Sequence, residues 1–159
     1  MTTYSVALSK GGSTKTTTAA EIVVALASRG RKVLAIDLDQ QGNLTTRMGV
    51  SRDTKVVAVT AEVLTGAVTA EEAAIAAPSV PGAFVLAGTH DLAKIDTQSV
   101  PDLVTALRDH LAAAAHVWDD VVIDTPPSLT GLTLAGLAAA DVVVPRWLAR
   151  SRRTTSSPA

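Results

Sequence analysis

Residues 4–17 read YSVALSKGGSTKTT, an apolar run followed by a glycine-containing loop and the dipeptide Lys15-Thr16. Residues with helical character follow this dipeptide as far as Ser28. A strand, a loop of small residues, Lys-Thr and then a helix form the local context of a phosphate-binding loop, in which backbone N–H groups and the helix N-terminus face the phosphates. The alternative interpretation is a glycine-rich turn that merely joins a strand to a helix.

The rest of the chain alternates short apolar runs with longer stretches of helical character. This pattern predicts an α/β fold whose mostly parallel sheet is covered by helices on both faces. Strands are expected at Tyr4–Ser9, Lys32–Asp37, Ala83–Ala87, Asp120–Asp124 and Asp141–Val144. Helices are expected at Lys15–Ser28, Thr60–Leu64, Ala70–Ala76, Pro101–Ala115 and Leu129–Ala139.

Acidic residues stand at the ends of two further expected strands. One strand closes on Asp37-Leu38-Asp39 and another closes on Asp124. Because ligands bind at the carboxyl ends of strands in α/β sheets, and because buried carboxylates need a cation, these positions indicate a site for Mg²⁺ with a nucleotide. The alternatives are an exposed acidic turn for the first two residues and a helix N-cap or turn for Asp124.

Charge divides the chain near residue 145. Residues 1–145 carry 10 Lys and Arg against 15 Asp and Glu, a net charge of −5, whereas residues 146–159 carry four Arg and no acidic residue. Residues 1–145 are therefore expected to form the packed domain, and the Ser/Thr/Arg-rich residues 146–159 a disordered tail. Four arginines in that tail could add nonspecific attraction to phosphates, but a solvated tail is the preferred interpretation.

Composition excludes several classes of protein. With no cysteine, the chain cannot hold a disulfide framework, a thiolate zinc site or an iron–sulfur cluster, and its four aromatic residues are too few for a base-stacking platform. The amino terminus lacks the pattern of a secretory signal, and no apolar run approaches the roughly 18 residues of a membrane span. A cytoplasmic location is expected.

Three motifs in this order resemble the ParA/Soj branch of the deviant Walker-A ATPases. They are Lys-Gly-Gly-x-x-Lys-Thr-Thr from Lys10, Asp-x-Asp-x-Gln-Gly-Asn from Asp37 and Ile-Asp-Thr-Pro-Pro-Ser-Leu from Ile123, within a resemblance covering residues 4 to about 145. The resemblance implies a P-loop NTPase-like fold, ATP and Mg²⁺ as ligands, and a role in plasmid or chromosome partitioning. It further implies ATP-dependent formation of a homodimer, and this dimerisation is coupled to DNA and to a ParB-like partner. A membrane is not among the implied partners.

The resemblance also implies roles for individual residues. Lys10 matches the lysine that crosses to the ATP of the partner subunit, Lys15 the phosphate-binding lysine, and Asp39 the aspartate that positions the attacking water; these are the implied catalytic residues. The implied nucleotide-binding residues are Gly11, Gly12, Ser13, Thr14, Lys15, Thr16 and Thr17. The residues that the resemblance places at the metal ion are Thr16, Asp37 and Asp124, and Asp124 takes the Walker-B position.

Thr14 departs from the family pattern, which usually has glycine directly before the lysine. If this position needs a positive φ or a close approach of the backbone, a β-branched residue would cost about 1 to 3 kcal/mol. We therefore expect weakened, but not abolished, nucleotide binding.

The end of the chain is a second departure. Family members continue for about another hundred residues beyond the segment that resembles Asp141–Pro145, and that part carries the adenine pocket, much of the dimer interface and the DNA-binding surface. None of it is recognisable in residues 146–159, so we expect a truncated or frame-shifted product that lacks the C-terminal part of the fold. Association with the nucleoid would require that DNA binding is retained.

Without the C-terminal part of the fold, Val142–Val144 would form an uncovered apolar strand, which predicts poor solubility of the protein.

These departures favour an alternative function, a catalytically silent nucleotide-binding or interaction module of the same fold. The presence of Lys10, Lys15, Asp39 and Asp124 favours the ATPase.

Overall fold

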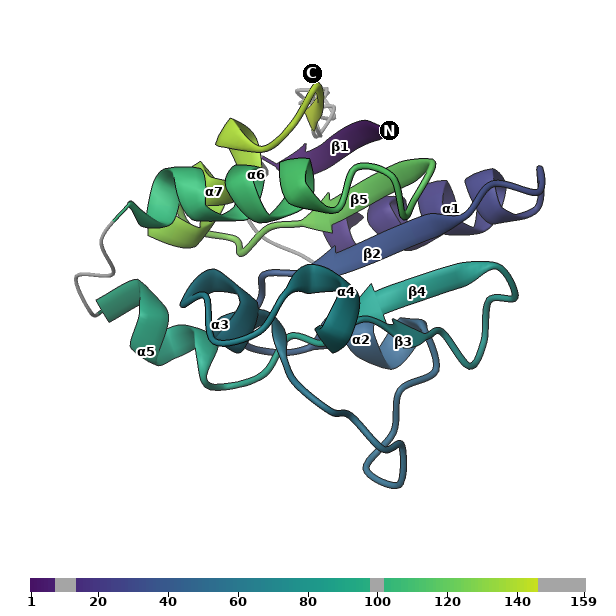
Figure 1. The fold of residues 1–159 in the computed structure, drawn as a ribbon, viewed down its shortest axis with the longest axis horizontal. Helices are drawn as coiled ribbons and strands as arrows, with labels where there is room; N and C mark the ends of the chain where they lie inside the picture. The colour runs from purple at the N-terminus through teal and green to yellow at the C-terminus, as the bar shows by residue number, and fades with distance from the viewer. Residues whose placement is uncertain (8–13, 98–101, 146–159) are drawn as a thin grey trace, which may run out of the picture.

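The computed structural model of the protein describes residues 1–7, 14–97 and 102–145. These residues form a six-stranded sheet in the order β3-β4-β2-β5-β1-β6 (Figure 1). All neighbouring strands are parallel except β3, which runs antiparallel to β4. The strands are β1 (Thr2–Ala7), β2 (Val33–Asp37), β3 (Ile75–Ala76), β4 (Ala83–Leu86), β5 (Asp120–Asp124) and β6 (Val142–Pro145). The predicted α/β class with a mostly parallel sheet is confirmed.

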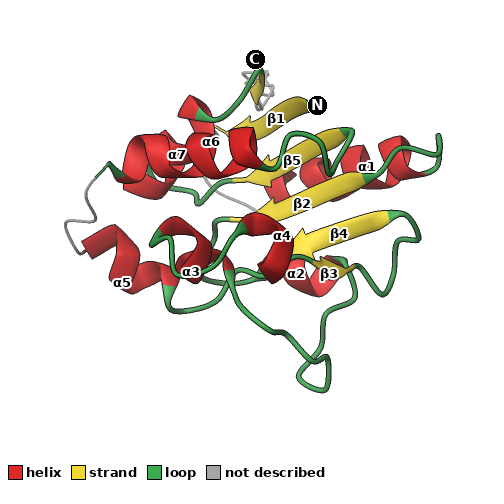
Figure 2. Ribbon diagram, viewed as in Figure 1, coloured by secondary structure: helices red, strands yellow, loops and turns green. Residues whose placement is uncertain are grey.

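Helices cover both faces of this sheet (Figure 2). Those that the structure describes are α1 (Thr14–Ala27), α2 (Asn43–Arg47), α3 (Thr60–Leu64), α4 (Ala70–Ala73), α5 (Leu92–Thr97), α6 (Leu103–Ala113) and α7 (Gly131–Ala138). One core cluster joins α1 and α2 to the sheet, and the other joins α3 to α7 to its opposite face. We call these two sides the α1 face and the α7 face.

Alternation along the central strands decides which side chains reach each face. Leu34 and Ile36 of β2 pack in the core of the α7 face, whereas Ala35 packs with Val122 of β5 in the core of the α1 face. Because successive side chains of a strand point to opposite faces, Asp37 and Asp124, two residues beyond Ala35 and Val122, point to the α1 face. The ends of β2 and β5 therefore direct both carboxylates toward the start of α1.

The helix expected at Ala70–Ala76 is shorter than predicted. A capping box formed by Thr69 and Glu72 begins α4, but the helix ends at Ala73, and Ala74 has an extended backbone with ψ of 127°. Ile75 and Ala76 instead pair with Val85 and Phe84 as β3. Pairing with a distant strand therefore overrides the helical propensity of this Ala-rich segment.

Two short helices, α2 and α5, were not predicted.

The expected helix start at Pro101 and the expected disorder of residues 146–159 lie outside the described residues. Within residues 1–7, 14–97 and 102–145, none of the helices combines the length and apolar character needed to cross a bilayer.

Candidate functional site at the carboxyl edge of the sheet

The acidic residues at the ends of β2 and β5 lie side by side. Asp37 pairs with Asp124 in the β2–β5 register, and Val6 of β1 pairs with Asp124 on the other side. The first turn of α1 brings Lys15 and Thr16 to the same edge, where both are buried. The structure thus brings together four of the residues that the sequence predicted for the site.

Asp124 is a buried carboxylate that has no hydrogen-bond partner among the described residues. Its side chain is fully buried, and neither Oδ1 nor Oδ2 forms a hydrogen bond with the described residues. Burial is the main reason why its pKa rises from 3.8 to about 7; the charges of Asp37 and Asp39 add to the rise, whereas the Thr16 hydroxyl and Lys15 oppose it. Thr16 therefore faces this carboxylate without completing a hydrogen bond of standard geometry.

This arrangement has the chemistry of a divalent-cation site. An unpartnered buried carboxylate is unfavourable by itself, and a cation shared with the Thr16 hydroxyl would supply the missing partner. The donors, a carboxylate and a hydroxyl at the start of a helix, are hard oxygen ligands that suit Mg²⁺. Among the described residues, no three His, Asp or Glu side chains converge to hold a metal on their own. The site therefore fits an ion that also takes oxygens from phosphate and water.

Asp37 has a different environment, although it is equally buried. Its Oδ2 accepts hydrogen bonds from the Thr45 N–H and the Thr45 hydroxyl, each at 2.8 Å, and its Oδ1 accepts one from the Asp39 N–H at 3.1 Å. Burial raises the pKa of Asp37, and these hydrogen bonds oppose the rise. Asp37 thus holds the loop after β2, and its role beside the metal stays a prediction.

Two glycines let the loops after β2 and β4 come together. A Cβ on Gly88 would lie 2.8 Å from both Asp37 Cγ and the Asp39 carbonyl oxygen. Gly42 has a φ of 63°, which favours glycine, and a Cβ there would lie 2.9 Å from the Gly88 carbonyl oxygen. Side chains at either position would force the two loops apart.

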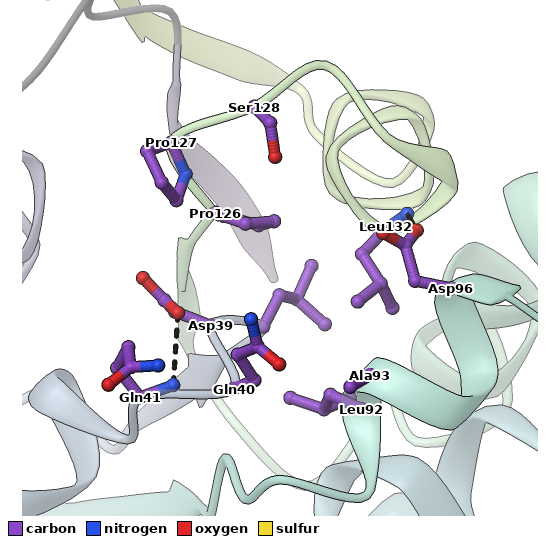
Figure 3. A pocket seen from close by; sticks show the side chains of 11 residues that line it. Asp39, Gln40, Gln41, Leu92, Ala93, Asp96, Pro126, Pro127, Ser128 and Leu132 are labelled. Carbon is purple, nitrogen blue, oxygen red and sulfur yellow. Dashed lines mark hydrogen bonds between the residues drawn. The ribbon is translucent and has the colours of Figure 1, made fainter.

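Asp39 lines a cavity of about 350 Å³ between the loops that follow β2 and β5 (Figure 3). Its Oδ1 accepts the Gln41 N–H at 3.0 Å, which fixes the carboxylate at the cavity wall. Asp96 of α5 stands across the cavity and accepts a long hydrogen bond of 3.4 Å from the Leu132 N–H at the start of α7. The remaining wall is formed by Leu38, Gln40, Gln41, Leu92, Ala93, Pro126, Pro127 and Ser128.

The structure describes only part of the predicted phosphate loop. Lys10, Gly11, Gly12 and Ser13 lie outside the described residues, whereas Thr17 lies in the first turn of α1. Thr14 is the first residue of α1, and among the described non-glycine residues only Asp102 has a positive φ. Thr14 therefore does not have the positive φ that would disfavour a β-branched residue. The reason that remains for expecting weakened binding is a close approach of the chain at Thr14 to the ligand.

Sequence reasoning missed Thr45 and Gly88, although both contact the predicted residues. The Gly88 N–H donates to the Thr45 hydroxyl oxygen at 2.9 Å, so Thr45 joins Asp37 to the loop after β4. One signal was available for Gly88, because it follows a predicted strand at the carboxyl edge of the sheet. Thr45 offered no comparable signal, since its position depends on the unpredicted helix α2.

Comparisons with known proteins agree with this geometry. The model of a family described as "AAA domain" matches residues 1–149. The chromosome-partitioning ATPase Soj of Thermus thermophilus is 41% identical over 140 residues, which cover 86% of this chain and 51% of that protein. The chromosome partitioning protein ParA of Caulobacter vibrioides is 38% identical over 142 residues, covering 87% and 52%. The chain thus spans about half the length of the curated relatives it matches.

Solved structures share the same architecture. A cobyrinic acid a,c-diamide synthase from Mycobacterium smegmatis, with bound ADP and magnesium, has a TM-score of 0.82 and 41% identity, covering 90% of this chain and 58% of its own. A plasmid partition protein from Borrelia burgdorferi has a TM-score of 0.75 and 25% identity, covering 89% and 62%. With the family match over residues 1–149 and these identities, the chain belongs to the ParA/Soj family of AAA-domain proteins.

Proposed function

We propose that this chain carries the ATP-binding site of a ParA-type partitioning ATPase, which binds ATP with Mg²⁺. The observation that carries the proposal is the buried Asp124 carboxylate, which has no hydrogen-bond partner in the described part of the chain and lies beside Lys15 and Thr16 at the start of α1. A helix N-terminus with a lysine attracts phosphate, while an unpartnered carboxylate attracts a cation, and Mg²⁺-ATP supplies both charges in one ligand.

In this proposal each described residue has one task. Lys15 neutralises phosphate charge, and Thr16 Oγ1 and Asp124 hold Mg²⁺, directly or through its water shell, with Asp37 as their acidic neighbour. When bound, Mg²⁺ neutralises charge on the β- and γ-phosphates. Asp39 orients the attacking water from the cavity wall. Lys10 reaches the ATP of a second copy in the dimer, a role that rests on the sequence resemblance.

The biological role proposed is plasmid or chromosome partitioning through an ATP-dependent homodimer. The names of the relatives support it, since Soj and ParA are chromosome-partitioning proteins and the Borrelia structure is a plasmid partition protein. A ParB-like partner and nonspecific DNA complete the proposal, with a cytoplasmic location and nucleoid association through DNA. Because the chain spans about half of these relatives, each of these partners has to be tested on the chain itself.

Binding of Mg²⁺-ATP to purified wild-type protein, measured by calorimetry, tests the first part of the proposal. Asp39→Ala is expected to keep this affinity and to lose about a hundredfold in turnover, because it removes the group that orients water and leaves Lys15, Thr16 and Asp124 in place. Asp53→Ala, an exposed acidic residue in the loop between α2 and α3, is the matched control. Equal turnover of wild type and Asp39→Ala would contradict the role of Asp39, and absence of ATP binding would contradict the whole proposal.

A catalytically silent nucleotide-binding module is the second candidate. Thr14, in the position where the family usually has glycine, is the observation that favours it. Turnover measured with DNA and a ParB-like partner separates the two: binding without hydrolysis in the wild type supports the silent module, whereas hydrolysis that depends on Asp39 supports the ATPase.

A further inference from the structure

A buried threonine joins the loops that follow β2 and β4. Thr45 lies in α2 and is 8% exposed, while the Asp37 carboxylate that it contacts is fully buried. The Thr45 hydroxyl donates to Asp37 Oδ2 at 2.8 Å and accepts the Gly88 N–H at 2.9 Å. One hydroxyl therefore serves as donor to the first loop and acceptor from the second.

The same network continues to Asp39. Asp37 Oδ1 accepts the Asp39 N–H at 3.1 Å, and the Asp39 carbonyl oxygen accepts the Gly42 N–H at 3.0 Å. On its other side, the Asp39 carbonyl oxygen lies against Gly88, where a Cβ would approach to 2.8 Å. The backbone of Asp39 is thus fixed from both sides by groups that Thr45 holds.

We infer that Thr45 is a positioning residue for ATP hydrolysis, which sets the place of Asp39 through Asp37 and Gly88. This inference rests on the proposed function, in which Asp39 orients the attacking water. A group that orients water must be held within a fraction of an ångström, so the hydrogen bonds behind it govern turnover. Without the hydroxyl, the Gly88 N–H would lose its acceptor in a buried environment, and the two loops would no longer share a hydrogen bond.

The test compares Thr45→Val, which keeps the shape and removes the hydroxyl, with Thr45→Ser, which keeps the hydroxyl. We expect Thr45→Val to lower kcat about tenfold or more while the Kd for Mg²⁺-ATP changes less than about threefold, and Thr45→Ser to restore kcat. Thr46→Val is the matched control, because the Thr46 hydroxyl is exposed and, among the described residues, donates only to the Gly42 carbonyl oxygen in its own helical turn. Wild-type kcat in folded Thr45→Val would overturn the inference, as would failure of Thr45→Ser to restore it.

A measurement without nucleotide separates this inference from the proposed function. Hydrogen exchange of the Gly88 and Asp39 amides is expected to accelerate about tenfold in Thr45→Val and to stay near wild type in Thr45→Ser and Thr46→Val. If the wild type hydrolyses no ATP, the proposed function fails, but the exchange rates still report whether Thr45 holds both loops. Unchanged exchange in Thr45→Val would overturn the structural half of the inference.

Gly88→Ala provides a second variant, for use if Thr45→Val does not give a cooperative thermal transition. Its Cβ would push against Asp37 and the Asp39 carbonyl oxygen without altering Thr45. Because Gly88 lacks a positive φ, the expected effect of alanine is displacement of these neighbouring groups. Lowered kcat with retained ATP affinity supports the part of the inference in which the place of Asp39 governs turnover, and wild-type kcat contradicts it.

Discussion

Asp37 and Asp124 occupy paired positions on the adjacent parallel strands β2 and β5, and both carboxylates are fully buried on the α1 face. Their surroundings differ, because Asp37 accepts three hydrogen bonds and Asp124 accepts none from the described residues. In the absence of a ligand, the ionised form of Asp124 is therefore the less stable of the two. This difference has a measurable consequence for folding.

Asp124→Asn is expected to stabilise the nucleotide-free protein more at high pH than at low pH. The pKa of Asp124 is about 7 in the folded protein and 3.8 ordinarily, so the folded state binds this proton more tightly than the unfolded state. The stability that the Asp124 carboxyl contributes to the wild type is therefore lost as the pH rises from about 4 to about 7. The difference in unfolding free energy should widen between pH 5 and pH 8, by up to about 2.5 kcal/mol. Urea unfolding without Mg²⁺ measures it.

Asp53→Asn is the control for this experiment, since Asp53 is exposed. Its unfolding free energy should follow that of the wild type at every pH. A difference between Asp124→Asn and wild type that does not vary with pH would show that the carboxylate does not titrate in this range.

Thr14→Gly and Thr14→Ala are both expected to tighten ATP binding, by several-fold. Thr14 begins α1 without a positive φ, so its side chain, rather than its backbone conformation, would crowd a phosphate. Calorimetric titration of ATP and Mg²⁺ into all three proteins measures the effect. Affinities equal to that of the wild type would refute weakened binding at Thr14, and tightening by glycine alone would point to the backbone.

Gly136→Ala is expected to destabilise the fold by about 1 to 3 kcal/mol, although alanine normally stabilises a helix. A Cβ on Gly136 would lie 2.9 Å from Thr125 Cγ2 and 3.1 Å from Leu38 Cδ1, so α7 would have to move away from the sheet. Thermal unfolding measures the loss. Leu134→Ala, on the exposed side of the same helix, should stay within about 0.5 kcal/mol of wild type. Equal or greater stability of Gly136→Ala would show that the contact relaxes without cost.

Val143→Lys is expected to lower aggregation of the 159-residue protein. Val142 and Val143 are each 41% exposed on β6, the last strand of the described sheet, and apolar edge strands pair with other chains. Light scattering at increasing protein concentration measures the change. Val57→Lys is the control, because Val57 is 71% exposed in a loop; an equal improvement there would assign the effect to added charge instead of the edge.

The parts of the fold that were predictable are those governed by local sequence. Apolar runs located β2 and β5, and the acidic residues that close them placed Asp37 and Asp124 at one edge, as the structure confirms. The strand at Ile75 and Ala76 was missed because its formation depends on Val85 and Phe84 in β4, and an Ala-rich segment alone favours a helix.

The site was predictable as a set of residue types, but not as a network. Lys15, Thr16 and Asp124 meet where the motifs indicated, whereas Thr45 reaches the site from the five-residue helix α2, which was not predicted. Its contacts with Asp37 and Gly88 join three segments separated by loops. Such a contact depends on the packing of the whole domain, and a local sequence pattern cannot predict it.

The order of the strands has a consequence for how the protein is made. β1 and β2 follow each other in the chain around α1, yet they never pair, because β5 lies between them. The pairings of Thr2 and Val33 with Asp120 close long loops, and closing them has to wait until the ribosome has released β5. During synthesis, β1 and β2 therefore lack the strand that lies between them until residue 124 has emerged, and their unpaired edges are open to pairing with other chains during that time.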